Sequence, residues 1–246
     1  NGEAAVDINN GVINFTARSI SVFSTAVNGI RLQNTTGTFT VTGDGGGASN
    51  GSGGTIANTT GDAVQLNNTN GLISLNYMII EDIGDMAGAM NTLTGHNAID
   101  GVNVNGGLSL NRTIIRRISD QAIFGGTFGS PDVATVWNGL TITNSTIENT
   151  NRYHVANIGD ANNEGMIRIL GIRGTVNIAN STLQDGAEML DFFVTAGTLD
   201  LTVTNSAFNR SYKEFTVGAL ASVGNHCIDV TVQGGNVNMV VGSRTV

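Results

Sequence analysis

The side chains able to do chemistry are few and lie far apart in the sequence. None of the three histidines, His96, His154 and His226, has the closely spaced partners of a zinc site, and neither has Cys227. The glycine-rich stretch 43–47 lacks the Lys-Ser/Thr that follows in a phosphate-binding loop. We therefore predict no catalytic set, no metal and no cofactor, and we expect the histidines in surface or turn positions.

The carboxylates also give little sign of a paired acid and base. Glu81 and Asp82 are adjacent, and successive residues of a strand point to opposite faces, so these two side chains should diverge. Four other aspartates have a small or apolar residue one or two positions later and are expected in turns, where Asp bonds its own backbone: Asp62, Asp100, Asp120 and Asp185.

Three aromatic residues could contact a glycan. Trp137, Tyr153 and Tyr212 each combine an apolar ring with a polar group, and sugars stack on such rings while Asn and Thr supply hydrogen bonds. The low aromatic content of 5% argues against an extended carbohydrate groove. The alternative is that these rings pack under loops or at the ends of the fold.

Composition narrows the class of protein. The 246 residues include 34 glycines and one proline, and 11 basic against 19 acidic residues give a net charge of −8. Such a chain lacks the basic surface that nucleic acids bind, and Lys213 is its only lysine. No apolar run reaches the roughly 18 residues needed to span a bilayer, and a single cysteine excludes an internal disulfide.

A degenerate repeat is the most informative pattern. Each copy reads as a Gly, an alternating strand, an Asn, and an apolar residue three positions later, with copies at 71–79, 107–114, 139–147, 174–183 and 197–208. Alternation is typical of strands, and the phase breaks at the Asn, a residue that tolerates the left-handed conformation of a tight corner. If the corners stack, their Asn side chains form a structural ladder: Asn76, Asn111, Asn144, Asn180 and Asn205.

With these segments and the stretches 29–45 and 53–64, the chain resembles the right-handed parallel β-helix repeats of the pectate-lyase-like superfamily. The likeness is strongest to the repeat tracts of very large bacterial secreted or cell-surface proteins of the adhesin type. It implies an all-β solenoid of roughly seven to eight coils. Loops inserted at corners would lie at 44–53, 84–95, 125–135 and 157–165.

The resemblance does not extend to an enzyme site. A polygalacturonase would carry Asn-Thr-Asp, Asp-Asp, Gly-His-Gly and Arg-Ile-Lys segments, and the nearest approach is Gly95-His96-Asn97. We therefore expect a non-catalytic structural or adhesive segment of an extracellular or cell-surface bacterial protein, which could assemble into fibres. A polysaccharide-binding or polysaccharide-processing module, similar to a lyase or glycosidase, is the alternative.

Domain organisation and partners follow from the same pattern. No linker divides residues 1–246, so we expect one domain, as a piece of a longer chain. Both ends read as ordinary strands whose edges would be open. The expected partners are further coils of the same chain or other copies of it, with surface glycans as a third candidate; no nucleic acid and no membrane insertion are expected.

Overall fold

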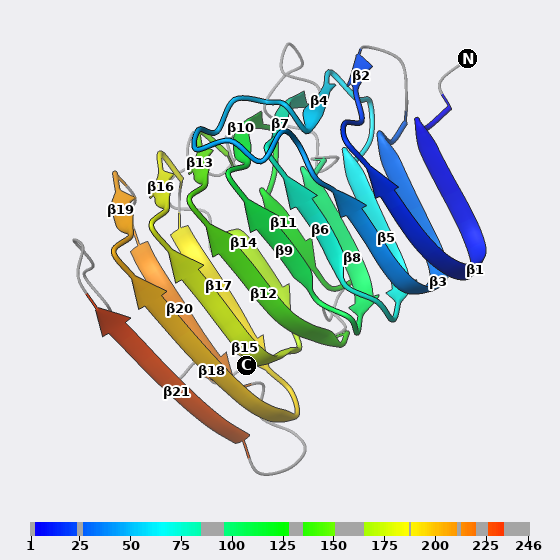
Figure 1. The fold of residues 1–246 in the computed structure, drawn as a ribbon. Coiled ribbons are helices and arrows are strands. Elements are labelled where there is room, and N and C mark those ends of the chain that lie inside the picture. Colours follow the sequence, from blue (N-terminus) through cyan, green and yellow to red (C-terminus); the bar gives the residue numbers. More distant parts are fainter. Residues whose placement is uncertain are drawn as a thin grey trace.

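The computed structural model describes residues 3–23, 27–84, 96–127, 135–150, 165–186, 188–210, 213–219 and 226–233. Within these ranges all regular secondary structure is β-strand, and every strand pairing is parallel (Figure 1). The prediction of an all-β chain of parallel strands is confirmed.

Most strands belong to one large sheet. It contains β1 (Val6–Ala17), β3 (Ile30–Val41), β5 (Val64–Thr69), β6 (Ile73–Asn76), β8 (Ile99–Val104), β9 (Leu108–Asn111), β11 (Ile123–Gly125), β12 (Trp137–Thr143), β14 (Gly165–Leu170), β15 (Ile172–Ala179), β17 (Glu188–Val194), β18 (Gly197–Thr204), β20 (Lys213–Ala219) and β21 (His226–Gln233). The main path through it is β20-β17-β14-β11-β8-β5-β3-β6-β9-β12-β15-β18-β21, and β1 pairs with β3.

A second, separate parallel sheet is built from short strands. Its strands lie side by side in the order in which they occur along the chain: β2 (Val22–Phe23), β4 (Gly54–Ala57), β7 (Met78–Ile83), β10 (Ile114–Ile118), β13 (Thr146–Glu148), β16 (Thr182–Gln184) and β19 (Ala207–Asn209).

The predicted fold class, a right-handed parallel β-helix solenoid of separate coils, is wrong. β3 pairs with β5 along its first half and with β6 along its second, and β12 pairs with both β8 and β9. Pairing therefore closes a ring of six parallel strands, β3, β5, β8, β12, β9 and β6, with the other strands of the large sheet outside it. β3 and β12 each pair with two strands in succession because they run on through Gly37 and Gly139, whose positive φ angles of 86° and 89° let each strand bend without ending.

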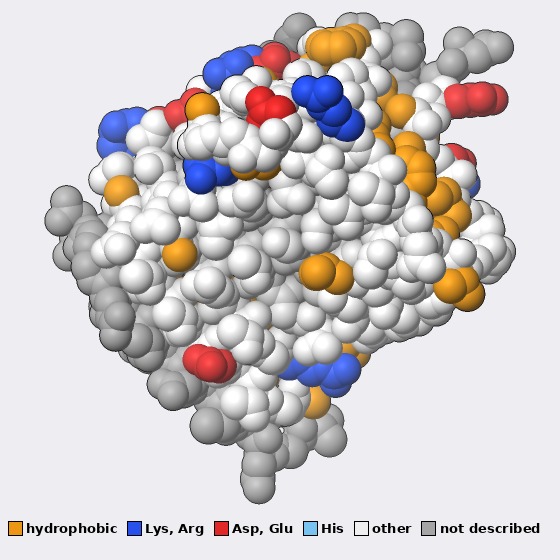
Figure 2. Space-filling model, viewed as in Figure 1, with side chains coloured by type: hydrophobic (Ala, Val, Ile, Leu, Met, Phe, Trp, Pro, Cys, Tyr) orange, Lys and Arg blue, Asp and Glu red, His pale blue; other side chains and the backbone are white. Residues whose placement is uncertain are grey.

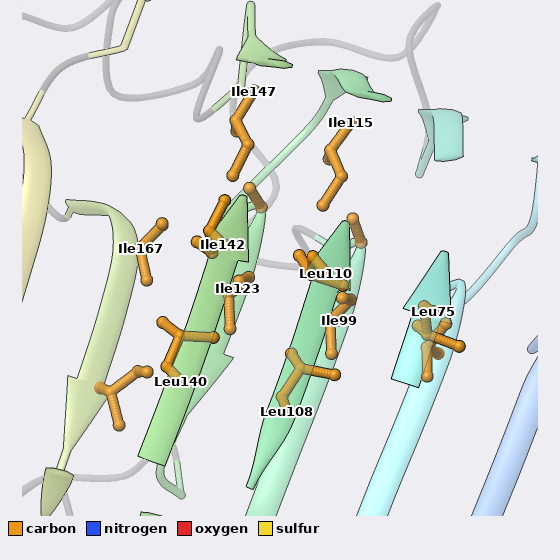
Figure 3. Packing of buried hydrophobic residues seen from close by; sticks show 14 of the residues in the cluster. Leu75, Ile99, Leu108, Leu110, Ile115, Ile123, Leu140, Ile142, Ile147 and Ile167 are labelled. Atoms are coloured by element: carbon orange, nitrogen blue, oxygen red, sulfur yellow. The ribbon is translucent and has the colours of Figure 1, made fainter. Parts of the chain in front are cut away.

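The core follows from the alternation in the sequence. Inward residues meet equivalent residues on the next strand; Leu75, Leu110 and Ile142, for example, are in register on β6, β9 and β12 and are fully buried. Figure 3 shows Leu110 and Ile142 facing Ile99 and Ile123 on the other part of the large sheet, with side chains of the second sheet closing the third side. Stacks of like aliphatic side chains at about 4.8 Å therefore hold the strands in register.

Buried hydroxyls line the corner that leads into the second sheet. The Thr113 N–H donates to Ser145 Oγ (3.1 Å), the Ser145 N–H to Ser181 Oγ (3.1 Å), and the Ser181 N–H to Ser206 Oγ (3.2 Å). The Ser181 hydroxyl in turn donates to the carbonyl of Ala179 (2.9 Å). This hydroxyl ladder satisfies backbone groups that the turn would otherwise leave unpaired inside the protein.

Replacing Ser181 with alanine is expected to destabilise the fold by about 1–3 kcal/mol, because the Ser145 N–H would lose its acceptor in a buried position. Ser109→Ala, on the outer side of β9, is the control and should stay within about 0.5 kcal/mol. Urea denaturation of both variants measures the difference. Equal midpoints would show that the hydroxyl ladder contributes nothing.

Candidate functional site

A row of outward side chains crosses four neighbouring strands of the large sheet. Asp100 of β8, Phe124 of β11, Arg168 of β14 and Asp191 of β17 are paired in register, each next to inward aliphatic residues. Strand alternation turns them away from the core, and parallel pairing sets them about 4.8 Å apart along the row. The row is hard to recognise in the sequence because the intervals between its members are irregular. Its only signal is that the inward residues Ile99, Ile123 and Ile167 are each followed directly by a member of the row.

Arg168 and Asp191 form a buried ion pair. Arg168 Nε lies 3.5 Å from Asp191 Oδ2, and the side chains are only 11% and 4% exposed. Glu188 is buried nearby on β17 and accepts a hydrogen bond from the Thr216 hydroxyl. Burying a charge pair is costly unless both partners stay engaged, so this arrangement fixes the position of the arginine.

Asp62 and Asp100 form a second polar group at the same side of the sheet. Asn97 links them, because its N–H donates to Asp62 Oδ1 (2.8 Å) and its amide Nδ2 donates to Asp100 Oδ2 (3.2 Å). His96 Nδ1 lies 3.9 Å from Asp62 Oδ1. Burial raises the pKa of Asp100 to about 7, with a further contribution from the negative charge of Asp62, and burial also raises the pKa of Asp62.

These residues are held by a polar ladder at the start of the strands. Asn28 Nδ2 donates to the Asp62 carbonyl (2.8 Å), and the Gln121 N–H donates to Asn97 Oδ1 (3.1 Å). The prediction that Asp100 lies in a turn is wrong, since it lies inside β8; Asp62 does precede a strand, and Asp185 has the left-handed φ of 60° typical of a turn.

The raised pKa of Asp100 predicts a pH-dependent effect of Asp100→Asn. In the unfolded chain the group titrates near 3.8 and in the folded protein near 7, so its charged form penalises folding as pH rises through this window. The asparagine variant should therefore be more stable than the parent by about 1–4 kcal/mol at pH 8, and this advantage should vanish toward pH 4. Unfolding by urea at several pH values measures it.

Asp185→Asn is the matched control, because it should show the opposite sign. The hydrogen bonds from Arg210 lower the pKa of Asp185, so this carboxylate favours folding once it is charged. The pair is exposed, and its loss should cost no more than about 1 kcal/mol at pH 8 and nothing in strong acid. The same pH dependence in both variants would rule out the assignment.

The prediction that the Glu81 and Asp82 side chains point in opposite directions is wrong. Asp82 has a φ of 55°, which interrupts strand alternation and brings both carboxylates to one arginine. Arg117 Nη2 lies 2.8 Å from Glu81 Oε2, and Arg117 Nε lies 2.6 Å from Asp82 Oδ1; Arg116 also contacts Glu81 at 2.7 Å. These ion pairs tie β7 to β10 and leave no separated acid and base.

The five predicted ladder asparagines all lie where strands of the large sheet end, but they do not occupy equivalent positions on their strands. Asn76 and Asn111 are paired in register at the ends of β6 and β9, whereas the other three lie one residue beyond the equivalent position, with left-handed φ. Asn76 Nδ2 donates to the Val41 carbonyl (2.8 Å), and Asn144 Nδ2 donates to Asn111 Oδ1 (3.1 Å). The Asn180 and Asn205 side chains are exposed.

Another set of asparagines does stack side chain to side chain. Asn68 Nδ2 donates to Asn34 Oδ1 and Asn103 Nδ2 donates to Asn68 Oδ1, both at 2.9 Å, and all three residues have φ between 50° and 55°. Their intervals of 34 and 35 residues match the repeat, which is the signal that could have identified them.

Of the predicted glycan-contact residues, Trp137 is fully buried, and its Nε1 donates to the Gly139 carbonyl (3.2 Å). It cannot offer a ring face to a sugar in this structure. Tyr153 and Tyr212 lie outside the described residues, as does His154, and so do most of the loops 84–95, 125–135 and 157–165.

The loop 44–53 contacts three successive corners of the fold. The Tyr77 hydroxyl donates to the Gly46 carbonyl (2.6 Å), Arg112 donates to the Gly47 carbonyl, and the Ser49 hydroxyl donates to the Asn144 carbonyl (3.2 Å). The sequence predicts no nucleophile elbow, although residues 47–51 do have its Gly-x-Ser-x-Gly spacing. The spacing falls in an irregular loop rather than between a strand and a helix, so it is no elbow.

Among the described residues, no group of three or more His, Cys, Asp and Glu side chains could hold a metal ion. The described part of the chain also contains no helix long and apolar enough to cross a membrane.

These features define an all-β protein with parallel sheets, and at that level the architecture is compatible with β-helix-like proteins. Searches of protein-family models, curated proteins and solved structures found no match to this chain.

Proposed function

We propose that this chain is a non-catalytic structural or adhesive segment of a bacterial protein that acts at the cell surface or outside the cell. The resemblance of its repeats to those of adhesin-type proteins suggests the setting. The observation that supports a structural role is that charged side chains form ion pairs between neighbouring segments of the fold. The ion pair Arg117–Asp82 joins β10 to β7, and Arg210–Asp185 joins the residues that directly follow β19 and β16, so these charges serve contacts between neighbouring segments of the fold.

The partners proposed are further repeats of the same chain or other copies of it. In the described residues β1 pairs only with β3, and its Val12 is 80% exposed. Phe15 stacks on Phe39, with ring centroids 4.8 Å apart, but remains only partly buried. A strand edge with incompletely covered apolar residues favours pairing with another strand.

Sedimentation of the purified chain over a concentration series tests this proposal, together with attachment to cells or coated surfaces. Association that increases with concentration, or attachment without turnover of any polysaccharide, supports a structural or adhesive role. A strictly monomeric chain that attaches to nothing would contradict it.

The second candidate function is processing of a polysaccharide, favoured by the Asp62–Asp100 pair near the buried Arg168–Asp191 pair. Carboxyl groups with raised pKa values gather at catalytic sites more often than elsewhere, although structural networks produce them too. Release of reducing or unsaturated ends from a polysaccharide, abolished by Asp100→Asn, would favour this candidate over the first.

A further inference from the structure

One broad face of the large sheet is polar but nearly free of charge. Figure 2 shows this face with charged side chains mainly at its margins. It is formed by the outer sides of β6, β9, β12, β15 and β18 together with the second half of β3. Two charged residues lie on these strands: Arg173 is near the start of β15, and Asp200 is exposed in the middle of β18.

Short hydroxyl and amide side chains form a straight rank across this face. Its members occupy equivalent positions on six neighbouring strands, are partly exposed, and are in register: Thr40, Ser74, Ser109, Thr141, Asn177 and Thr202. Parallel pairing spaces them by about 4.8 Å. The rank is therefore a repeated array of the same chemistry.

A second rank runs beside the first, two residues further along β6, β9, β12, β15 and β18. It contains Asn76, Asn111, Thr143 and Thr204, with Ala179 as the one apolar member. Residues two apart in a strand lie about 6.6 Å from each other on the same face. We call the two ranks together the hydroxyl face.

The chemistry of the hydroxyl face selects the kind of partner. Hydroxyls and amides both donate and accept hydrogen bonds, which suits sugar hydroxyls. The one Arg and the one Asp of these strands leave no net charge to attract an anionic or cationic polymer. The net charge of −8 adds general repulsion of polyanions. With Trp137 buried, aromatic stacking from that residue does not contribute.

We infer that the hydroxyl face binds the surface of a neutral, hydroxyl-rich polysaccharide. The inference rests on the adhesive role proposed above and names the chemistry of its target. Each contact is weak, because a sugar hydroxyl exchanges water for a similar partner. Binding therefore depends on many simultaneous contacts. The hydroxyl face should bind the surface of an insoluble polymer but not short soluble oligosaccharides.

Depletion of the purified chain from solution by microcrystalline cellulose and by chitin powder tests this inference, with polygalacturonate-coated beads as the anionic comparison. We expect binding to at least one neutral polymer that changes less than twofold between low and high salt, and no binding to polygalacturonate. Binding only to the anionic beads, or to none of these solids, would overturn the inference.

Two matched double variants locate the surface. Ser109→Arg with Thr141→Arg places two bulky charges on adjacent strands of the hydroxyl face, in register. Thr146→Arg with Thr182→Arg does the same on β13 and β16 of the second sheet. We expect the first pair to weaken binding at least tenfold and the second less than twofold; equal effects would overturn the assignment.

A milder variant guards against a folding defect. Thr141→Val with Ser109→Ala removes two hydroxyls at little change of volume, so circular dichroism should stay unchanged while binding weakens. Unchanged binding would overturn the inference. Attachment to cells without binding to neutral polymers would overturn it while the adhesive role stands, whereas turnover of the polymer would contradict the adhesive role itself.

Discussion

Gly71→Ala is expected to destabilise the protein by about 3 kcal/mol or more, the range reached when a side chain is forced into a closely packed site. A Cβ atom at residue 71 would lie 1.2 Å from the carbonyl oxygen of Gly37, and Gly106 stacks on the other side of Gly71. Because both neighbours are backbone, no side chain can move aside, and the paired segments must separate.

Gly47→Ala is the control for this substitution. A Cβ there would meet nothing within 4 Å, so the change should stay within about 0.5 kcal/mol. Chemical denaturation of the two variants gives the comparison. A Gly71 variant as stable as the Gly47 variant would show that the three glycines are not in close contact.

Trp137→Ala should cost about 3–5 kcal/mol, as for other large buried aromatic residues. The indole is fully buried and occupies the space above two glycines of neighbouring strands: a Cβ at Gly101 would lie 2.2 Å from Cζ3, and a Cβ at Gly125 would lie 2.7 Å from Cε3. If Trp137 instead served as an exposed sugar platform, its removal would alter binding and leave stability nearly unchanged.

Phe23→Ala supplies an aromatic control, because this side chain is 59% exposed, and a loss below about 1 kcal/mol is expected. Combining Trp137→Ala with Gly101→Ala extends the test. Gly101→Ala should be much less damaging when the indole is absent, and thermal unfolding of the double variant measures this coupling. Additive losses would contradict direct contact between the two positions.

Much of the strand structure was predictable because alternation is local. The repeat placed Leu108 and Leu110 inward, and both are buried. Strand connectivity was less predictable, since a single glycine decides whether the chain turns or only bends: Gly37 and Gly139 continue their strands. No local pattern distinguishes these glycines from the others in so glycine-rich a sequence.

The candidate site was harder to predict than the strands. Asp100 and Arg168 are far apart in the chain, and only the register of β8, β11 and β14 sets them in one row. Asparagine stacking was predicted as a principle, and Asn144 does bond the Asn111 side chain, but a run of three stacked side chains lies instead at Asn34, Asn68 and Asn103. Residue type alone could not separate the asparagines whose side chains meet from those that mainly supply a left-handed backbone.

The absence of antiparallel pairs within the described strands has a kinetic consequence. β1 and β3, for example, join residues 24 apart in the chain, as with Val6 and Ile30, and the described strands form no tight hairpin. Each parallel pair must close a long loop before its contacts repay the lost chain entropy. Folding is therefore expected to be slow, and unpaired strands persist long enough for aggregation to compete with productive assembly.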